Sequence, residues 1–343
     1  MLPLFTEETM SKYLTAAEVL PFLHGCCGTY MLDGYTCFTR FTAEELAYYG
    51  DRSGTDFVRS HAPSGIRLDF ITDAPEISFT YRLYRDKGFY ILHSGFDIWE
   101  DGVFGANYRI DPGVTDEITV SYTRKKIEPS RIQIHFTNGS VVLMDKFCLG
   151  NAVPVEKKEK SILFYGDSLT QSAYIPTPSL SWAHTMAEHM DAEALNRGIG
   201  SMIFEAPSLP SAPDCVPDMI FIEYGCNDLG KTPDNETGLA LADAWMKKIC
   251  KLYPTAEKFC IPPDFSPRGD CSDAYWNRME PYCTGLAEIS RLYGIHVIPG
   301  KILIPDLPDL FFEDLTHFNE AGSAIFAGNL QYAAERIHRG ETL

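Results

Sequence analysis

The chain has 343 residues, of which 45% are hydrophobic and 22% charged, a globular composition that excludes wholesale disorder. Its formal charge of −18 argues against nucleic-acid binding and electrostatic membrane docking, and no apolar run approaches the ~20 residues that span a bilayer. The length predicts two domains. Residues 1–8 lack the basic and apolar regions of a signal peptide, and the ten cysteines lack zinc-site spacing. We therefore expect a cytoplasmic protein with reduced thiols.

The first 150 residues have the pattern of an antiparallel β domain. Short runs alternate between apolar and polar residues, and turn sequences separate them. The runs are 65–72, 77–83, 118–122, 131–136 and 141–144. Asn138-Gly139, between the last two runs, predicts a β-hairpin. Strands at this spacing indicate a β-sandwich or jelly roll.

A charged stretch, 155–160, predicts the linker between two domains at 1–155 and 156–343. Beyond it, near-continuous apolar runs typical of buried strands alternate with helical patterns. The strands are expected at 161–165, around Ala194, and at 218–224, 258–261 and 295–298, and the helices at 181–192, 238–253, 273–293 and 319–338. This alternation predicts a parallel sheet flanked by helices, with ligands binding at the carboxyl ends of its strands.

Two motifs at such positions suggest nucleophilic catalysis. Ser168, in Gly166-Asp-Ser-Leu-Thr170, follows the strand at 161–165, and a serine hydroxyl needs an adjacent general base to become a nucleophile. Asp314 and His317 lie three residues apart before the last helix, where the histidine can act as that base and the carboxylate can orient it. Taken singly, Ser168 could be a helix cap and Asp314 a capping residue beside a surface histidine.

Two further motifs could stabilise an oxyanion. Asn227 follows the strand at 218–224 and could donate through its side-chain amide. The glycines of Asn196-Arg-Gly-Ile-Gly-Ser201 would let a backbone N–H approach the same oxygen. The alternatives are an ordinary Asn-Asp turn and a plain glycine loop.

With these four motifs in this order, residues 161–340 resemble the GDSL, or SGNH, hydrolase family. The resemblance implies a flavodoxin-like α/β/α fold and a serine esterase that needs no metal or cofactor. It also implies that Ser168 is the nucleophile, His317 the base and Asp314 its orienting carboxylate.

The same resemblance implies an oxyanion hole formed by the Ser168 N–H, the Asn227 amide and one backbone N–H of the glycine loop. The family usually has glycine where this chain has Ser201, one residue after Gly200. Both Gly200 and Ser201 therefore remain candidates for the third donor.

The β domain resembles the jelly roll that precedes the SGNH domain in some carbohydrate esterases. The similar segments are Arg40-Phe-Thr42, 65–70 and 95–102. This resemblance implies that the chain removes a short acyl group, acetyl in particular, from an oligosaccharide. The charge of −18 argues against nucleic acid or a membrane as partner. The alternatives are a short-chain lipase or thioesterase on the same site, and an inert glycan-binding protein.

Overall fold

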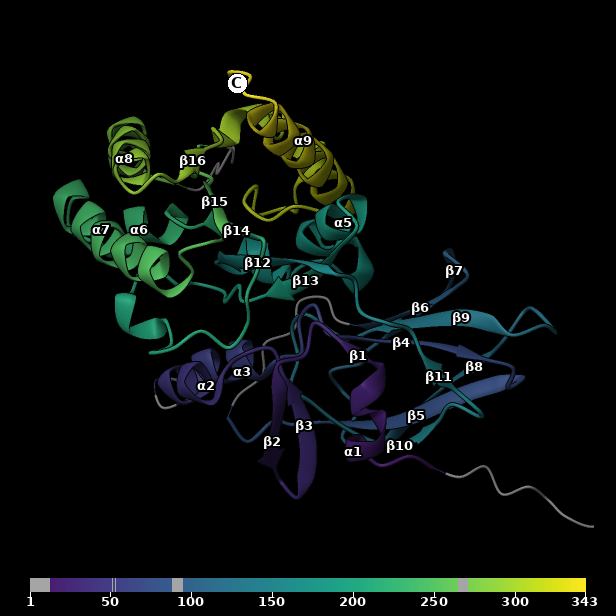
Figure 1. Cartoon of the computed structure of the whole chain (residues 1–343). Helices are drawn as coiled ribbons and strands as arrows, with labels where there is room; N and C mark the ends of the chain where they lie inside the picture. The colour runs from purple at the N-terminus through teal and green to yellow at the C-terminus, as the bar shows by residue number, and fades with distance from the viewer. Residues whose placement is uncertain (1–12, 51, 53, 88–94, 265–270) are drawn as a thin grey trace, which may run out of the picture.

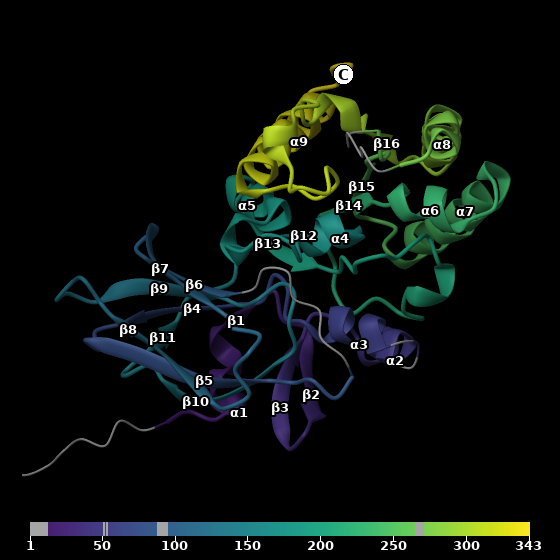
Figure 2. The ribbon, with the colours of Figure 1, turned by 180° about the vertical axis from the view of Figure 1, so that it is seen from behind.

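The computed structural model describes residues 13–50, 52, 54–87, 95–264 and 271–343. Antiparallel strands dominate the first part of the chain, and a parallel sheet covered by helices forms the second, as Figure 1 shows from one side and Figure 2 from behind. Residues 1–8, on which the signal-peptide prediction rests, lie outside the described residues. Within these ranges, no helix is both long and apolar enough to cross a bilayer.

The first part contains two antiparallel sheets that share one core. The larger sheet has the order β1-β4-β9-β6-β7 with β11 beside β4, and the smaller has the order β10-β5-β8. Their bounds are β1 (Leu23–His24), β4 (Arg67–Thr72), β6 (Gly95–Glu100), β7 (Val103–Arg109), β9 (Ser130–His135) and β11 (Val153–Pro154), then β5 (Glu76–Leu83), β8 (Ile118–Thr123) and β10 (Val142–Cys148).

Apolar side chains from both sheets meet in this core. Phe70 and Ile134 come from the larger sheet, whereas Phe79 and Val120 come from the smaller, and all four are buried in one cluster. The antiparallel sandwich expected from the alternating pattern is therefore confirmed. Its more specific assignment as a jelly roll stays a prediction.

The hairpin predicted at Asn138-Gly139 is wrong. β9 pairs with β4 and β6, so neither of its edges is open, and β10 pairs with β5 in the other sheet. The connection crosses between sheets, and Asn138 is buried where its carbonyl accepts from Ser64 Oγ at 2.7 Å and Gln171 Nε2 at 3.1 Å. These contacts, rather than strand pairing, hold the turn.

Three helices and a small hairpin of the first part were not expected from the sequence. They are α1 (Ala16–Val19), α2 (Ala43–Gly50), α3 (Gly54–His61) and the β2–β3 pair (Gly28–Leu32, Tyr35–Thr39). α2 begins with a capping box, in which Thr42 Oγ1 accepts from the Glu45 N–H and Glu45 accepts from the Thr42 N–H. Phe41 and Tyr49 pack into the core of the second part, so this helical segment covers the parallel-sheet domain.

The second part is a three-layer α/β/α domain. Its five strands are all parallel in the order β13-β12-β14-β15-β16, as in flavodoxin-like folds. The strands are β12 (Lys160–Gly166), β13 (Ala192–Asn196), β14 (Met219–Glu223), β15 (Glu257–Cys260) and β16 (His296–Val297). The predicted fold class is confirmed.

Helices cover both faces of this sheet. α5 (Trp182–His189) and α9 (Glu320–His338) pack on one face, and α6 (Cys226–Lys231), α7 (Asn235–Leu252) and α8 (Asp273–Leu292) pack on the other (Figure 1). The chain runs from β12 outward to β13 on one side and to β14 on the other. The carboxyl ends of β12 and β14 therefore flank a switch point, where ligands bind in this class of fold.

Candidate active site

Ser168 lies at the carboxyl end of β12, where the strand turns sharply into the short helix α4 (Ser168–Gln171). Asp167 caps this helix by accepting from the Leu169 N–H at 3.1 Å. Ser172, at φ 56°, ends it. A rigid strand, a cap and an abrupt helix end thus fix the backbone that carries the Ser168 hydroxyl.

The structure brings Ser168 together with His317 and Asp314. His317 Nε2 lies 2.7 Å from Ser168 Oγ, and His317 Nδ1 lies 2.6 Å from Asp314 Oδ2, although the serine and histidine are 149 positions apart. Asp314 Oδ1 accepts from the backbone N–H groups of Thr316 and His317, each at 3.0 Å. One continuous hydrogen-bonded chain therefore joins carboxyl, imidazole and hydroxyl.

The Asp314 carboxyl is held in its ionised form. Burial alone would raise its pKa, but hydrogen bonds from the His317 ring and from the His317 and Thr316 backbone outweigh burial and lower the pKa to about 2. An ionised carboxylate can only accept, so Nδ1 carries the proton. Nε2 is then free to accept the proton of Ser168 Oγ, which is the geometry of general-base catalysis.

Tyr174 also contacts this chain of hydrogen bonds. Its ring stacks on the His317 imidazole, with centroids 3.6 Å apart and planes 7° from parallel. The backbone N–H of Phe312 donates to the His317 carbonyl at 2.8 Å and so ties the histidine loop together. The stacked ring restricts rotation of the imidazole about its χ2 angle. No sequence motif marked Tyr174, because stacking across 143 positions leaves no local pattern.

Asn227 follows β14 in the first turn of α6. Gly225 is the N-cap residue of that helix and has φ 124°, a backbone conformation that residues other than glycine rarely adopt. Asn227 Nδ2 donates to Asp167 Oδ2 at 2.8 Å, so Asn227 is bonded to the residue that precedes Ser168. A side-chain amide has two N–H groups, and this bond occupies one of them.

The two candidates in the glycine loop differ in structure. The Gly200 N–H donates to Gln171 Oε1 at 2.7 Å and is therefore engaged. Ser201 has φ 64°, the left-handed conformation that favours glycine, and its N–H makes no hydrogen bond to any described residue. Ser201 thus adopts a backbone conformation that a glycine would adopt more easily.

Arg40 holds the glycine loop from the other part of the chain, and sequence reasoning did not assign it a role. Its fully buried guanidinium donates to the carbonyls of Asn196 at 3.0 Å and Gly198 at 2.7 Å. It also donates to the carbonyls of Ala62 at 3.1 Å and Arg59 at 3.0 Å, at the end of α3. Burial and the neighbouring Arg197 lower the Arg40 pKa to about 9.

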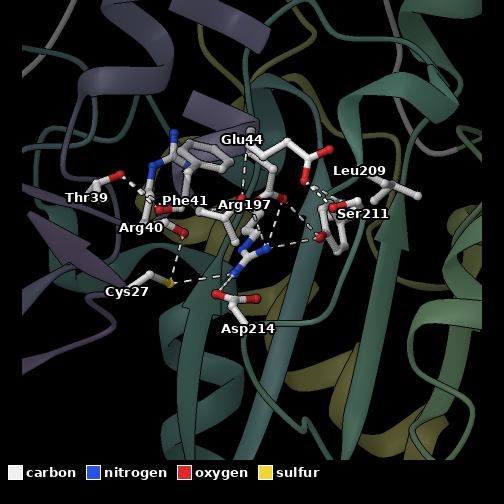
Figure 3. Close-up of polar contacts among 12 residues, drawn as sticks. Cys27, Thr39, Arg40, Phe41, Glu44, Arg197, Leu209, Ser211 and Asp214 are labelled. Atoms are coloured by element: carbon white, nitrogen blue, oxygen red, sulfur yellow. Dashed lines mark hydrogen bonds and ion pairs between the residues drawn. The ribbon is translucent and has the colours of Figure 1, made fainter. Parts of the chain in front are cut away.

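Arg197, inside the loop, is anchored separately. Its guanidinium pairs with Glu45 of α2 at 2.7 Å and with Asp214, and lies 3.6 Å from Cys27 Sγ. Figure 3 shows Cys27 and Asp214 at the Arg197 guanidinium, with Arg40 to one side next to Phe41. The segment that includes α2 and α3 therefore fixes the loop that carries Gly200 and Ser201.

Asp167, Glu223 and Cys226 form a buried acidic group next to Ser168. Their potential ligand atoms lie within 4.8 Å of one another. However, Asp167 accepts from Asn227, and Glu223 Oε2 accepts from Thr170 Oγ1 at 2.8 Å. Because these oxygens are engaged with donors, the group fits an internal hydrogen-bond network better than a cation site.

A small recess opens beside Ser168 and His317. Tyr174, Trp182 and Phe318 contribute to its walls, and its volume is about 10 Å³. A space of this size holds roughly one water-sized group. Neither Asn227 nor the Gly200–Ser201 segment lines this recess, so its size does not define the space for the acyl group.

Comparisons with known proteins agree with this geometry. Residues 164–325 match the GDSL-like Lipase/Acylhydrolase family. Among solved structures, a salicylyl-acyltransferase from a tetracycline biosynthetic pathway superposes with a TM-score of 0.76 at 16% identity, covering 97% of this chain and 99% of that chain. An acetyl xylan esterase from the rumen bacterium Butyrivibrio proteoclasticus gives 0.63 at 13% identity, covering 95% and 99%.

A family two carbohydrate esterase from Cellvibrio japonicus gives a TM-score of 0.64 at 14% identity, covering 94% of this chain and 96% of that chain. No curated protein matches the sequence. Residues 164–325 form a GDSL-like lipase/acylhydrolase domain, and an antiparallel β domain precedes it. The chain is accordingly a carboxylic ester hydrolase.

Proposed function

We propose that the chain is a serine esterase that removes a short acyl group, acetyl in particular, from a carbohydrate. The observation that carries this proposal is the hydrogen-bonded chain from Asp314 through His317 to Ser168. In the first step, Ser168 Oγ attacks the ester carbonyl while His317 Nε2 takes its proton. Asp314 stabilises the imidazolium that forms.

Three donors stabilise the oxyanion of the tetrahedral intermediate in this proposal. They are the backbone N–H groups of Ser168 and Ser201 and the side-chain amide of Asn227. We choose Ser201 over Gly200 because the Gly200 N–H already donates to Gln171. A preorganised donor of this kind is worth about 2.7–4 kcal/mol of transition-state stabilisation.

The remaining steps regenerate the enzyme. The carbonyl–alkoxy bond breaks, and the sugar hydroxyl leaves with the proton held by His317. Water then attacks the acyl-enzyme while His317 takes a proton from it, and Ser168 leaves with that proton as its bond to the acyl carbon breaks. Acetate and the deacylated sugar are the products.

The identity of the substrate is a separate part of the proposal. It is supported by the likeness to an acetyl xylan esterase and a carbohydrate esterase and by the preceding β domain. The likeness to a salicylyl-acyltransferase favours one further candidate, in which an acceptor hydroxyl replaces water in the second step. The boundary at 155/156, the jelly-roll assignment and the cytoplasmic location stay predictions.

The test is hydrolysis of p-nitrophenyl acetate, butyrate and octanoate by the wild type and Ser168→Ala, together with acetylated xylo-oligosaccharides. The proposal predicts Ser168-dependent activity that falls steeply with chain length and is higher on the sugars. A preference for octanoate indicates the lipase or thioesterase alternative. Product esters that form only with an added alcohol indicate acyl transfer, and the absence of any turnover leaves the glycan-binding alternative.

A further inference from the structure

A second cavity lies where the larger antiparallel sheet meets the parallel-sheet domain. Its volume is about 250 Å³, and its walls come from β6 and β9 on one side and from α5 and the preceding turn, Pro178–Leu180, on the other. Neither Ser168 nor His317 lines it. The lining residues that matter for its chemistry are Trp99, Gln133, His135, His184 and Glu188.

Two buried histidines in this cavity have unused hydrogen-bonding capacity. His135 of β9 is 5% exposed and His184 of α5 is 8% exposed. Their rings meet edge to face with centroids 4.5 Å apart, yet neither imidazole is hydrogen bonded to another described residue. Because buried polar groups in proteins are nearly always hydrogen bonded, two bare imidazoles at a cavity wall indicate a polar occupant.

Both imidazoles are uncharged at neutral pH. Burial is the main cause that lowers both pKa values well below 6.5. The neighbouring His184 and the cations Arg67 and Arg131 lower the His135 pKa further, and Arg67 and Lys158 do the same for His184. A neutral imidazole offers one donor and one acceptor. The pair therefore suits hydroxyl groups, which also donate and accept, better than an ion.

The charged side chains around the histidines are paired with one another. Arg131 pairs with Asp69 at 2.6 Å, Arg67 lies 3.5 Å from Glu188 and 3.6 Å from Glu193, and Lys158 lies 3.2 Å from Glu188 and 3.3 Å from Asp191. Glu188 also lines the cavity, where its carboxylate can accept from hydroxyl groups and repels an anion. The cavity selects an uncharged, polar molecule.

The opposite wall adds an aromatic surface and an amide. Trp99 of β6 is partly buried and stands edge-on to Phe104, with centroids 5.4 Å apart. Gln133 Nε2 donates to Asp69 at 3.1 Å, which leaves the Gln133 amide oxygen as an acceptor. An indole beside hydrogen-bonding groups suits a molecule with one apolar face and a hydroxylated rim.

We propose that this cavity is a binding site for one uncharged sugar ring, separate from the ester-cleaving site. The ring hydroxyls bond His135 and His184, and its C–H face packs against Trp99. At about 30 Å³ per water molecule in the liquid, the cavity volume corresponds to roughly eight waters, which is room for one pyranose ring. The site would hold one residue of a glycan whose acetylated residue lies elsewhere.

The experiment titrates wild type and Ser168→Ala with xylose, glucose and unsubstituted xylobiose, following tryptophan fluorescence and heat of binding. We expect saturable binding by both proteins, so the result does not depend on whether Ser168 is the nucleophile. Glucuronate, which adds a negative charge, should bind at least tenfold more weakly than glucose. Equal or tighter binding of glucuronate, or no saturation by any neutral sugar, would overturn the proposal.

Two variants locate the site. Trp99→Phe should remove the fluorescence response, whereas Trp276→Phe, on the exposed surface of α8, is the matched control and should keep it. His184→Phe retains an aromatic ring but removes both nitrogens, and it should weaken binding at least tenfold. Thermal melting establishes that each variant is folded. Binding unchanged in a folded His184→Phe protein contradicts the assignment.

Discussion

Replacing Arg40 with methionine tests whether the first part of the chain controls catalysis in the second. Arg40 donates to four backbone carbonyls, two on the glycine loop and two at the end of α3. Methionine fills much of the same space but donates no hydrogen bond. The carbonyls of Asn196, Gly198 and Ala62 would then lose the donor that Arg40 supplies. The Arg59 carbonyl would keep its bond from Gln171, which also accepts from the Gly200 N–H, so the loop would lose its direct attachment to α3 but not the link through Gln171.

The magnitude follows from these contacts. A hydrogen bond from a charged donor contributes about 1.5–3 kcal/mol to stability. The substitution removes four such bonds, but it also removes the cost of burying the Arg40 charge, which offsets part of the loss. We expect the free energy of unfolding to fall by roughly 3–5 kcal/mol, as when a buried ionic contact is broken. If the loop shifts enough to misplace the Ser201 N–H, kcat falls by about 10²–10³-fold with little change in KM.

The assay combines p-nitrophenyl acetate kinetics with urea unfolding. Arg40→Lys keeps a charge and some of the donors and should lie between the wild type and Arg40→Met. Arg82→Met is the matched control, because Arg82 is 37% exposed and pairs with Asp33 at the surface. A folded Arg40→Met protein with kcat within twofold of the wild type would refute the view that Arg40 positions the loop.

Three further predictions concern single side chains. Asp314→Asn should lower kcat by about 10³-fold or more at pH 7, because the amide no longer stabilises the imidazolium; a loss below tenfold in pH-rate measurements argues against its role. Ser201→Gly should raise the free energy of unfolding by up to about 1 kcal/mol, since glycine accepts φ 64° without strain, and should retain kcat because the proposed donor is the backbone N–H; destabilisation in urea contradicts this. Burial and the nearby Asp167, opposed by the Phe204 N–H, raise the pKa of Asp228 to about 7, above its usual value of 3.8. Its protonated form is therefore the one that folding favours, and the stability it gives is complete below about pH 4 and lost as the pH rises through 7. In the wild type this loss lowers the free energy of unfolding on the order of 4 kcal/mol between pH 4 and 8, and Asp228→Asn should abolish that decrease. A pH profile of unfolding that is the same in the variant as in the wild type would contradict the burial argument.

The sequence predicted the parts of the site that are fixed by local motifs at strand ends. Ser168, Asn227 and His317 lie near the carboxyl edge of one sheet because β12 and β14 are adjacent and parallel and the last loop returns to them. Alternating strands and helices were enough to predict that edge. The capping box from Thr42 to Glu45 is also a local signal for α2, although the alternating pattern of the first 150 residues indicates strands alone.

The parts that the sequence did not predict depend on tertiary contacts. Asn138-Gly139 has hairpin residues, but β9 already has a partner on each side. The choice between Gly200 and Ser201 depends on the φ angle of Ser201 and on the hydrogen bond that the Gly200 N–H donates to Gln171, 29 positions earlier in the chain. Arg40 looks like an ordinary charged residue after a strand, and only the fold places its guanidinium against the glycine loop.

The central claim is that Ser168 carries the acyl group during turnover. The most direct measurement is mass spectrometry of the intact protein and its peptides after rapid quenching with an acetyl ester, for the wild type and Ser168→Ala. The account predicts a transient acetyl group on the peptide that contains Ser168 in the wild type, and none in the variant. An acetyl group on another residue, or full turnover by a variant that is never acetylated, would contradict it.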